Sequence, residues 1–213
     1  MPKPTRIDVL PKTKEIKYDY SKTLAQIQGQ AMDTIDPYGF HGISVTQGYM
    51  QGAMRMAPEM KLGYATYPKH DVVCVWYDSI TIPIEIDPTI VVAKEVYADS
   101  CMRKAVVEHE LKHIRVDREV VNKYARAIGT KVYQGLQQRG FISQPIRTAD
   151  AQQVSERMQK VVMQIIEFEL KKMDLERTER QQAVDSLEEY NRVSALCPEF
   201  ELKRSALLGK ATK

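Results

Sequence analysis

Cysteine, tryptophan and histidine are scarce in this chain: its 213 residues include three Cys, one Trp and four His. Three cysteines are too few for a disulfide framework, and Cys74, Cys101 and Cys197 are not spaced like pairs of metal ligands. One bridge with a free thiol, three reduced thiols and small buried apolar residues are all compatible with these positions. The cysteines alone therefore indicate no function.

Long apolar runs and an excess of charge of one sign are also lacking. The longest apolar stretches, such as Val72–Tyr77, have the length of a strand, whereas a membrane-spanning helix needs roughly 18 apolar residues. The 31 basic and 28 acidic residues leave a formal net charge of +3, which gives no electrostatic argument for nucleic acid. We therefore expect no membrane span and no nucleic-acid partner; the sequence does not determine the oligomeric state.

The N-terminal segment lacks the apolar core of a signal peptide. Met1–Leu10 contains Lys3 and Arg6 but no apolar h-region, so no signal peptide is expected in the sequence as written. The localisation stays open between the cytosol and, if a leader has been removed, the periplasm or the exterior of the cell.

The first hundred residues have the composition and spacing of short strands. β-branched residues are frequent between positions 72 and 86, and prolines and glycines separate the apolar segments. The best strand candidates, which short connections would join into an antiparallel sheet, are Lys61–Tyr67, Asp71–Tyr77, Ile80–Ile86 and Thr89–Val96.

The second half has helical periodicity. Apolar residues recur at three- and four-residue steps from Cys101 to Leu136, Gly140–Pro145 interrupts them, and a second pattern runs from Thr148 towards Tyr190. We therefore predict an α+β fold in which a small antiparallel sheet precedes a long antiparallel helical hairpin. The expected organisation is a single domain over residues 1–213, with a β-rich half (1–98), the hairpin (99–197) and a tail (198–213).

Within the first predicted helix lies the pattern His109-Glu110-Leu111-Lys112-His113, which has the H-E-x-x-H spacing. Residues four apart on a helix differ by about 40° around the axis and about 6 Å along it, so both imidazoles can converge on one ion. Neutral imidazole is a good ligand of Zn²⁺. The motif therefore predicts a zinc site formed by His109 and His113, and the expected single domain is zincin-like.

Glu110 lies about 100° around the helix from His109 and can reach a water molecule beside the metal rather than the metal itself. Zinc lowers the pKa of such a water to about 7, and a nearby carboxylate can then accept its proton. The alternative is a pair of surface histidines among charged neighbours such as Glu108, Lys112 and Arg115. The cation of Lys112 opposes metal binding unless its amine points to solvent.

A catalytic zinc ion needs a third protein ligand and an open coordination position. If the two helices run antiparallel about Gly140–Pro145, the motif faces residues near 175–179. Glu179 is therefore the expected third ligand, followed by Glu176 and, if the register slips, by Asp185.

Asp117 lies one turn beyond His113, too far along the axis to share the ion with His109. It is expected either to accept a hydrogen bond from the outer nitrogen of His113 or to form a solvated ion pair with Lys or Arg.

The order of these features resembles an uncharacterised bacterial family known as predicted secreted zinc-dependent proteases. The resemblance covers roughly residues 16–133, and a weaker similarity extends over residues 183–190. It rests on Tyr18-Asp19-Tyr20 with Thr23-Leu24, on Val73-Cys74-Val75-Trp76-Tyr77, on Ile80–Ile86 and on the histidine motif. It implies that His109 and His113 are zinc ligands and that Glu110 is the catalytic base. The chain departs from that family at Lys112, where a glycine is expected, and in Asp185-Ser186-Leu187-Glu188, where a histidine is expected.

These observations predict a zinc-dependent metallohydrolase, most simply a peptidase acting on a peptide or protein substrate. His109, His113 and Glu179 would hold Zn²⁺, and Glu110 would be the catalytic residue. The alternative is a non-catalytic envelope or adaptor protein, in which the metal is structural or absent and the helices form a docking surface.

Overall fold

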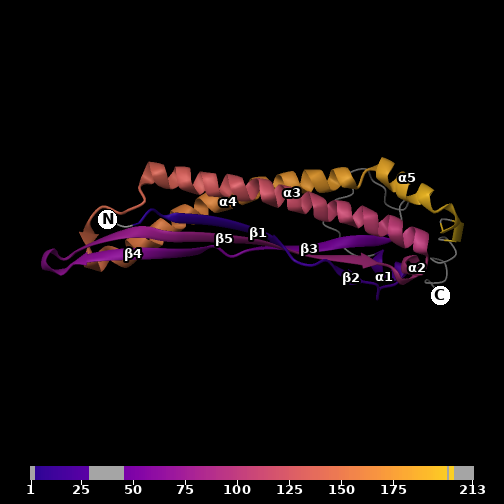
Figure 1. The fold of residues 1–213 in the computed structure, drawn as a ribbon, viewed down its shortest axis with the longest axis horizontal. Coiled ribbons are helices and arrows are strands. Elements are labelled where there is room, and N and C mark those ends of the chain that lie inside the picture. Colours follow the sequence, from indigo (N-terminus) through magenta and orange to yellow (C-terminus); the bar gives the residue numbers. More distant parts are fainter. Residues whose placement is uncertain (1–2, 29–45, 201, 204–213) are drawn as a thin grey trace. The chain divides into compact units, whose positions relative to one another are not determined.

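One long strand organises the sheet in the computed structural model, which describes residues 3–28, 46–200 and 202–203 (Figure 1). All other strands of the six-stranded sheet pair with this strand, β5. The strands are β1 (Arg6–Thr13), β2 (Lys17–Asp19), β3 (Gly48–Met56), β4 (Glu59–Tyr67), β5 (Val72–Val92) and β6 (Ile146–Arg147). The α-helices are α1 (Leu24–Ile27), α2 (Lys94–Tyr97), α3 (Ser100–Arg139), α4 (Ala151–Val184) and α5 (Leu187–Leu196), with 3₁₀ turns at Pro68–His70 and Thr148–Asp150.

Strand β5 joins segments that the sequence suggested were separate strands. Its 21 residues include Pro83 and Pro88; each proline removes one N–H donor, but its φ is compatible with an extended chain. The register against β4 passes from Ser79 directly to Tyr77, so Asp78 forms a bulge. This extra residue reverses the alternation and keeps the apolar residues on both sides of it on one face of the sheet.

The expected small antiparallel sheet followed by a helical hairpin is wrong, because the protein has a six-stranded mixed sheet with helices, an α/β arrangement. β4 and β6 pair with β5 in antiparallel orientation, whereas β2 pairs with it in parallel, with Lys17 opposite Thr89. The error came from assuming that consecutive strands pair with each other. β2 pairs instead with a segment about seventy residues further along the chain, and β6 returns to the sheet between α3 and α4.

The first long helix begins where the sequence placed it, whereas the second begins at Ala151, after a 3₁₀ turn at Thr148–Asp150, and ends earlier than expected. Asp99 accepts a hydrogen bond from the Met102 amide at 2.9 Å and caps α3. The second helical pattern was expected to continue towards Tyr190, yet α4 ends at Val184 and α5 begins at Leu187. Ser186 caps α5, because its side chain accepts from the Glu189 amide. This break leaves Asp185 outside both helices.

The chain forms two compact units, one of residues 1–12, 54–85 and 120–174, the other of residues 13–53, 86–119 and 175–213. β5, α3 and α4 contribute residues to both. In the first unit, α3 and α4 bury apolar side chains that include Ile128, Leu136, Val162 and Ile166. The core of the second unit comes from α1, the end of β5, α2, the beginning of α3, and the α5 region, with Leu24, Ile27, Ile90, Val91, Val92, Ala93, Val96, Met102, Ala105, Val106, Ile114, Val193, Cys197 and Phe200.

A disulfide between Cys101 and Cys197 connects the first turn of α3 to the end of α5, and Cys74 is a free thiol. Of the arrangements that the sequence left open, the chain therefore has one bridge and one free cysteine. Most of the expected tail lies outside the described residues. None of the described helices has the length and apolarity required to cross a membrane.

Removing this disulfide is expected to destabilise the protein considerably. The bridge joins residues 96 positions apart, and closing a loop of that length restricts the unfolded chain by roughly 4–5 kcal/mol in the chain-entropy model. We expect Cys101→Ser/Cys197→Ser to lower the free energy of unfolding by about 2–5 kcal/mol in chemical denaturation. Cys74→Ser is the matched control and should change it little. Equal unfolding midpoints for the double variant and the wild type would contradict the expected role of the bridge.

Candidate metal centre

Helix α3 brings the two histidines of the motif together. Their side chains are buried, with His109 8% and His113 6% exposed, and their Nε2 atoms lie 3.3 Å apart. The rings are nearly perpendicular, with an interplanar angle of 82°. The helical spacing thus produces the convergence that the sequence predicted.

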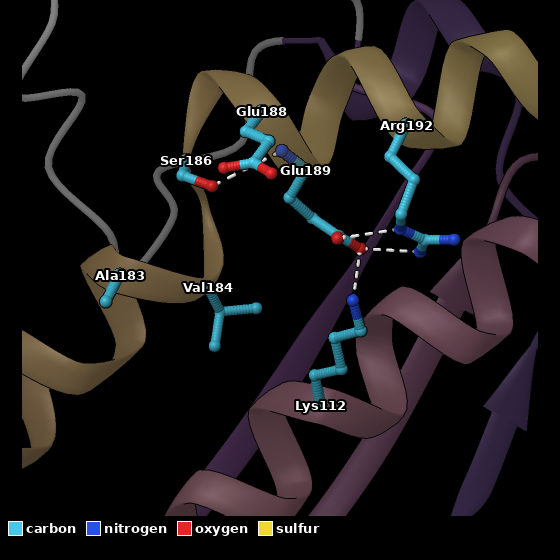
Figure 2. Close-up of a pocket in the computed structure, with 7 residues that line it drawn as sticks. All are labelled: Lys112, Ala183, Val184, Ser186, Glu188, Glu189 and Arg192. Carbon is cyan, nitrogen blue, oxygen red and sulfur yellow. Dashed lines mark hydrogen bonds and ion pairs between the residues drawn. The ribbon is translucent and has the colours of Figure 1, made fainter.

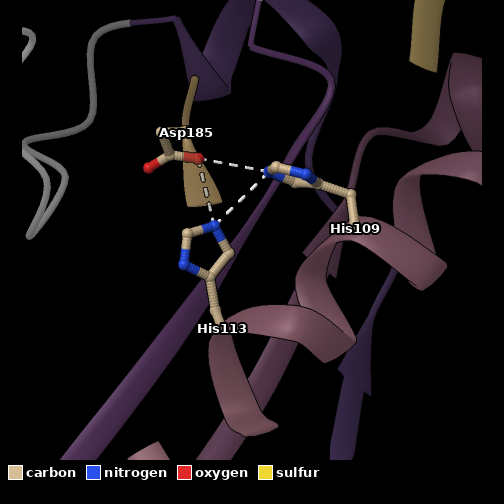
Figure 3. A group of neighbouring side chains, drawn as sticks. All are labelled: His109, His113 and Asp185. Atoms are coloured by element: carbon tan, nitrogen blue, oxygen red, sulfur yellow. Dashed lines mark hydrogen bonds and ion pairs between the residues drawn. The ribbon is translucent and has the colours of Figure 1, made fainter. Parts of the chain in front are cut away.

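Asp185 completes a cluster of three potential metal ligands (Figure 3). Its Oδ1 atom lies 3.2 Å from Nε2 of His109 and 3.1 Å from Nε2 of His113. Tetrahedral zinc with ligands at roughly 2.0–2.1 Å holds neighbouring ligand atoms roughly 3.3 Å apart. The three atoms therefore form a triangle of the size that one such ion requires.

The hydrogen-bonding chemistry of these atoms also fits a shared cation. An ionised carboxylate oxygen only accepts, and each Nε2 atom either carries one proton or offers one lone pair. If both rings donate to Asp185, two N–H groups point into the same small space and the Nε2–Nε2 approach of 3.3 Å contains no hydrogen bond. A cation at the centre would instead accept a lone pair from all three atoms.

The outer ring nitrogens have acceptors of their own, which places the histidine lone pairs on the inner side. His109 Nδ1 lies 3.3 Å from a carboxylate oxygen of Glu189, and His113 Nδ1 lies 2.5 Å from the amide oxygen of Gln181. A proton on each Nδ1 atom satisfies these contacts and leaves both Nε2 atoms unprotonated. Metal-binding histidines are commonly held in this way.

The carboxylates favour positive charge at this cluster. Burial lowers the pKa values of both histidines, but the hydrogen bonds and charge of Asp185 outweigh it, so the pKa of His109 is raised and that of His113 rises to about 9. Burial raises the pKa of Asp185, yet its bonds to the two imidazoles hold it well below its usual value. The surrounding carboxylates therefore stabilise positive charge on the inner side of the cluster, which either a metal ion or protons on the Nε2 atoms can supply.

Glu110 is buried beside the cluster, with 4% of its surface exposed. Desolvation raises the pKa of its carboxyl group, opposed by the charges of His109 and His113 and by a hydrogen bond from the Met50 backbone. A desolvated carboxylate with a raised pKa beside histidines has the properties of a general base.

Glu179 is not part of the cluster, because its side chain is exposed on α4. Glu176 is half-buried and lies 3.9 Å from Arg180. Asp185, the third choice from the sequence, takes the position expected for Glu179. The sequence argument favoured Glu179 because it assumed that the motif faces residues near 175–179, whereas His113 contacts Gln181 and His109 contacts Asp185. The register is therefore shifted towards the C-terminus, the condition under which Asp185 was expected, and Asp185 itself lies just after the end of α4.

Asp117 combines parts of the two roles that the sequence suggested. It is 1% exposed and pairs with Arg177 at 2.7 Å, so the ion pair exists but is not solvated. It also accepts a hydrogen bond from Nε2 of Gln181 at 2.6 Å. Asp117 thus reaches the outer nitrogen of His113 through Gln181 rather than directly.

Lys112, the cation inside the motif, is held away from the histidine Nε2 atoms. Its amine lies 2.7 Å from Glu189, which also pairs with Arg192 at 2.6 Å. The pKa of Glu189 is lowered to about 2. Hydrogen bonds from Arg192 contribute most to this shift, those from Lys112 and His109 add to it, and burial acts in the opposite direction. The positive charge of Lys112 therefore helps to keep ionised the carboxylate that orients His109.

A pocket of roughly 400 Å³ lies next to this ion-pair network (Figure 2). It adjoins the cluster because Glu189, which contacts His109, forms part of its wall. Both signs of charge are present in its lining, which consists of Lys112, Ala183, Val184, Ser186, Glu188, Glu189 and Arg192.

Gln181 and Glu189 were missed by the sequence analysis, and Asp185 was ranked too low. A local signal was available in Ser186-Leu187-Glu188-Glu189, because Ser followed three residues later by Glu is typical of a helix N-terminus. That pattern would have indicated the helix break and placed Asp185 immediately before a new helix. Gln181 has no comparable signal, because its importance depends on tertiary contacts.

Comparisons of the chain with protein-family models, with curated proteins and with solved structures found no match. The resemblance to predicted secreted zinc-dependent proteases therefore stays a prediction.

Proposed function

We propose that this protein is a zinc-dependent metallohydrolase, and that its substrates are peptides or proteins. The observation that carries the proposal is the triangle of His109 Nε2, His113 Nε2 and Asp185 Oδ1, with edges of 3.1, 3.2 and 3.3 Å. Two imidazole nitrogens and one carboxylate oxygen favour zinc over magnesium or calcium, which prefer oxygen ligands alone.

The number of ligands favours a catalytic site over a structural one. Within the described part of the chain, the group contains three residues that offer ligand atoms. Structural zinc sites usually have four protein ligands, whereas catalytic sites have three and leave one position for water or substrate. The two histidines and Asp185 match the second pattern.

Glu110 is the proposed catalytic residue. A bound zinc ion would supply Lewis acidity, which polarises a substrate carbonyl and acidifies water. Glu110 follows His109 directly, is buried and interacts electrostatically with all three proposed ligands. Its carboxylate would accept a proton from the attacking water and return it to the leaving amine. The pocket lined by Lys112 and Arg192 lies on the outer side of His109 and is the proposed location of part of the substrate.

Metal content and thermal stability together test the zinc site. We expect one zinc ion per chain in purified protein, and a lower melting temperature after removal with a chelator, because a ligand bound only by the folded state stabilises it. At a zinc concentration about 100 times the dissociation constant, the stabilisation is about 2.7 kcal/mol. Adding zinc back should restore the original melting curve, which controls for irreversible damage by the chelator. Protein that neither retains nor takes up zinc, with identical melting curves throughout, would reject the site.

A further inference from the structure

Gln181 is buried between the cluster of proposed metal ligands and the ion pair of Asp117 with Arg177. The oxygen and the nitrogen of its amide group contact different partners. The amide oxygen lies 2.5 Å from His113 Nδ1. The amide nitrogen donates to Asp117 Oδ1 at 2.6 Å and to the backbone oxygen of His113 at 3.1 Å. Gln181 is 5% exposed, so water contributes little to satisfying its amide group.

The orientation of this amide follows from its neighbours. Asp117 forms a buried ion pair with Arg177, whose Nε lies 2.7 Å from Oδ1 and whose Nη2 lies 3.4 Å from Oδ2. An ionised carboxylate has no proton to donate, and a backbone carbonyl has none either. Both partners of the amide nitrogen are therefore pure acceptors, so the –NH₂ group of Gln181 must face them and its oxygen must face His113.

We propose that Gln181 is a positioning residue that keeps the His113 proton on Nδ1 and thereby directs the Nε2 lone pair to the metal. Because the amide oxygen is only an acceptor, His113 Nδ1 must be the donor in their contact. The neutral ring then has no proton on Nε2, the atom that faces His109 and Asp185. The series of hydrogen bonds from Arg177 to Asp117, Gln181 and His113 thus determines which ring nitrogen can bind zinc. This inference rests on the proposed zinc site but not on hydrolysis.

Two variants test this role. The first removes the acceptor at position 181, and the second, the swap variant, exchanges the acidic and amide side chains of positions 117 and 181. Gln181→Met keeps the approximate shape but removes the strong acceptor, and we expect zinc affinity to fall 10–100-fold, the usual effect of losing the outer partner of a metal-binding histidine. Asp117→Asn/Gln181→Glu exchanges the carboxylate and the amide. In this double variant, the new amide at position 117 would donate to the new carboxylate at position 181. That carboxylate still accepts from His113 Nδ1 but can no longer donate to the His113 backbone oxygen, so part of the affinity lost in Gln181→Met should return.

The control is Glu119→Gln, which removes the exposed ion pair between Glu119 and Arg180. This pair also connects α3 to α4, close to Asp117 and Arg177, but it lies outside the cluster. Zinc affinity is measured by competition with a chromophoric chelator, and the control should match the wild type. In zinc-loaded protein labelled with ¹⁵N-histidine, the Nδ1 proton of His113 should exchange slowly in the wild type, the control and the swap, and faster in Gln181→Met.

Three results would overturn the inference. The first is wild-type zinc affinity and slow Nδ1 exchange in Gln181→Met. The second is a swap variant that folds but binds zinc as weakly as Gln181→Met, because Gln181 would then be needed only as a structural bridge. The third is wild-type protein that binds no zinc, which would reject the proposed function and this inference together, whereas the first two leave the zinc site intact.

Discussion

Glu110→Gln is expected to retain zinc and to lose peptide hydrolysis by about 10²–10⁴-fold, the range contributed by a general base. Glutamine has the shape of glutamate but cannot accept the proton of the attacking water. Glu110 offers no ligand atom to the cluster, so zinc content should stay at the wild-type level. Hydrolysis is measured by mass spectrometry on a mixed peptide library, and zinc by metal analysis of the same samples.

Glu108→Gln is the matched control for this experiment. Glu108 lies on the same helix, but its side chain is 49% exposed and forms an i,i+4 pair with Lys104, which contributes little at the surface. Its replacement should leave hydrolysis unchanged. Full hydrolysis in zinc-loaded Glu110→Gln would show that Glu110 is not the base.

The same experiment separates the two classes of function. A zinc-loaded wild type that cleaves no peptide, together with a large effect of the chelator on melting, would indicate a structural ion. The non-catalytic adaptor would then be the better interpretation. The buried position of Glu110 beside three proposed ligands favours the enzyme, because an adaptor gives no reason to desolvate a carboxylate at that point.

The local part of the site could be predicted from the sequence because helical geometry determines it. His109 and His113 are one turn apart on a helix that the apolar periodicity indicated, and no tertiary information is needed to bring their rings together. The third member of the cluster required knowledge of how α3 and α4 are aligned and of where α4 ends. An error in that alignment therefore placed Glu179, rather than Asp185, beside the two histidines.

The sheet was harder to predict for a related reason. Apolar alternation identified the segments that form β5, because period-two burial is visible in the sequence. Pairing partners are not visible there: β2 lies in parallel beside residues 89–91, and β6 comes from the connection between the long helices. The bulge at Asp78, which changes the alternation, was mistaken for a boundary between two strands.

Asp185→Ala is expected to reduce zinc affinity by more than the 10–100-fold typical of outer partners, to about the level of His109→Ala, because each variant leaves two ligands. Glu179→Ala is the matched control: it removes the acidic side chain that the helical register favoured, which is exposed on α4. Its affinity should equal that of the wild type when measured by chelator competition. The opposite order, weak binding in Glu179→Ala and normal binding in Asp185→Ala, would show that the cluster of His109, His113 and Asp185 is not the zinc site. The break between α4 and α5 would then have no role in metal binding, since its proposed contribution is to release Asp185 from the helix and direct it towards the two imidazoles.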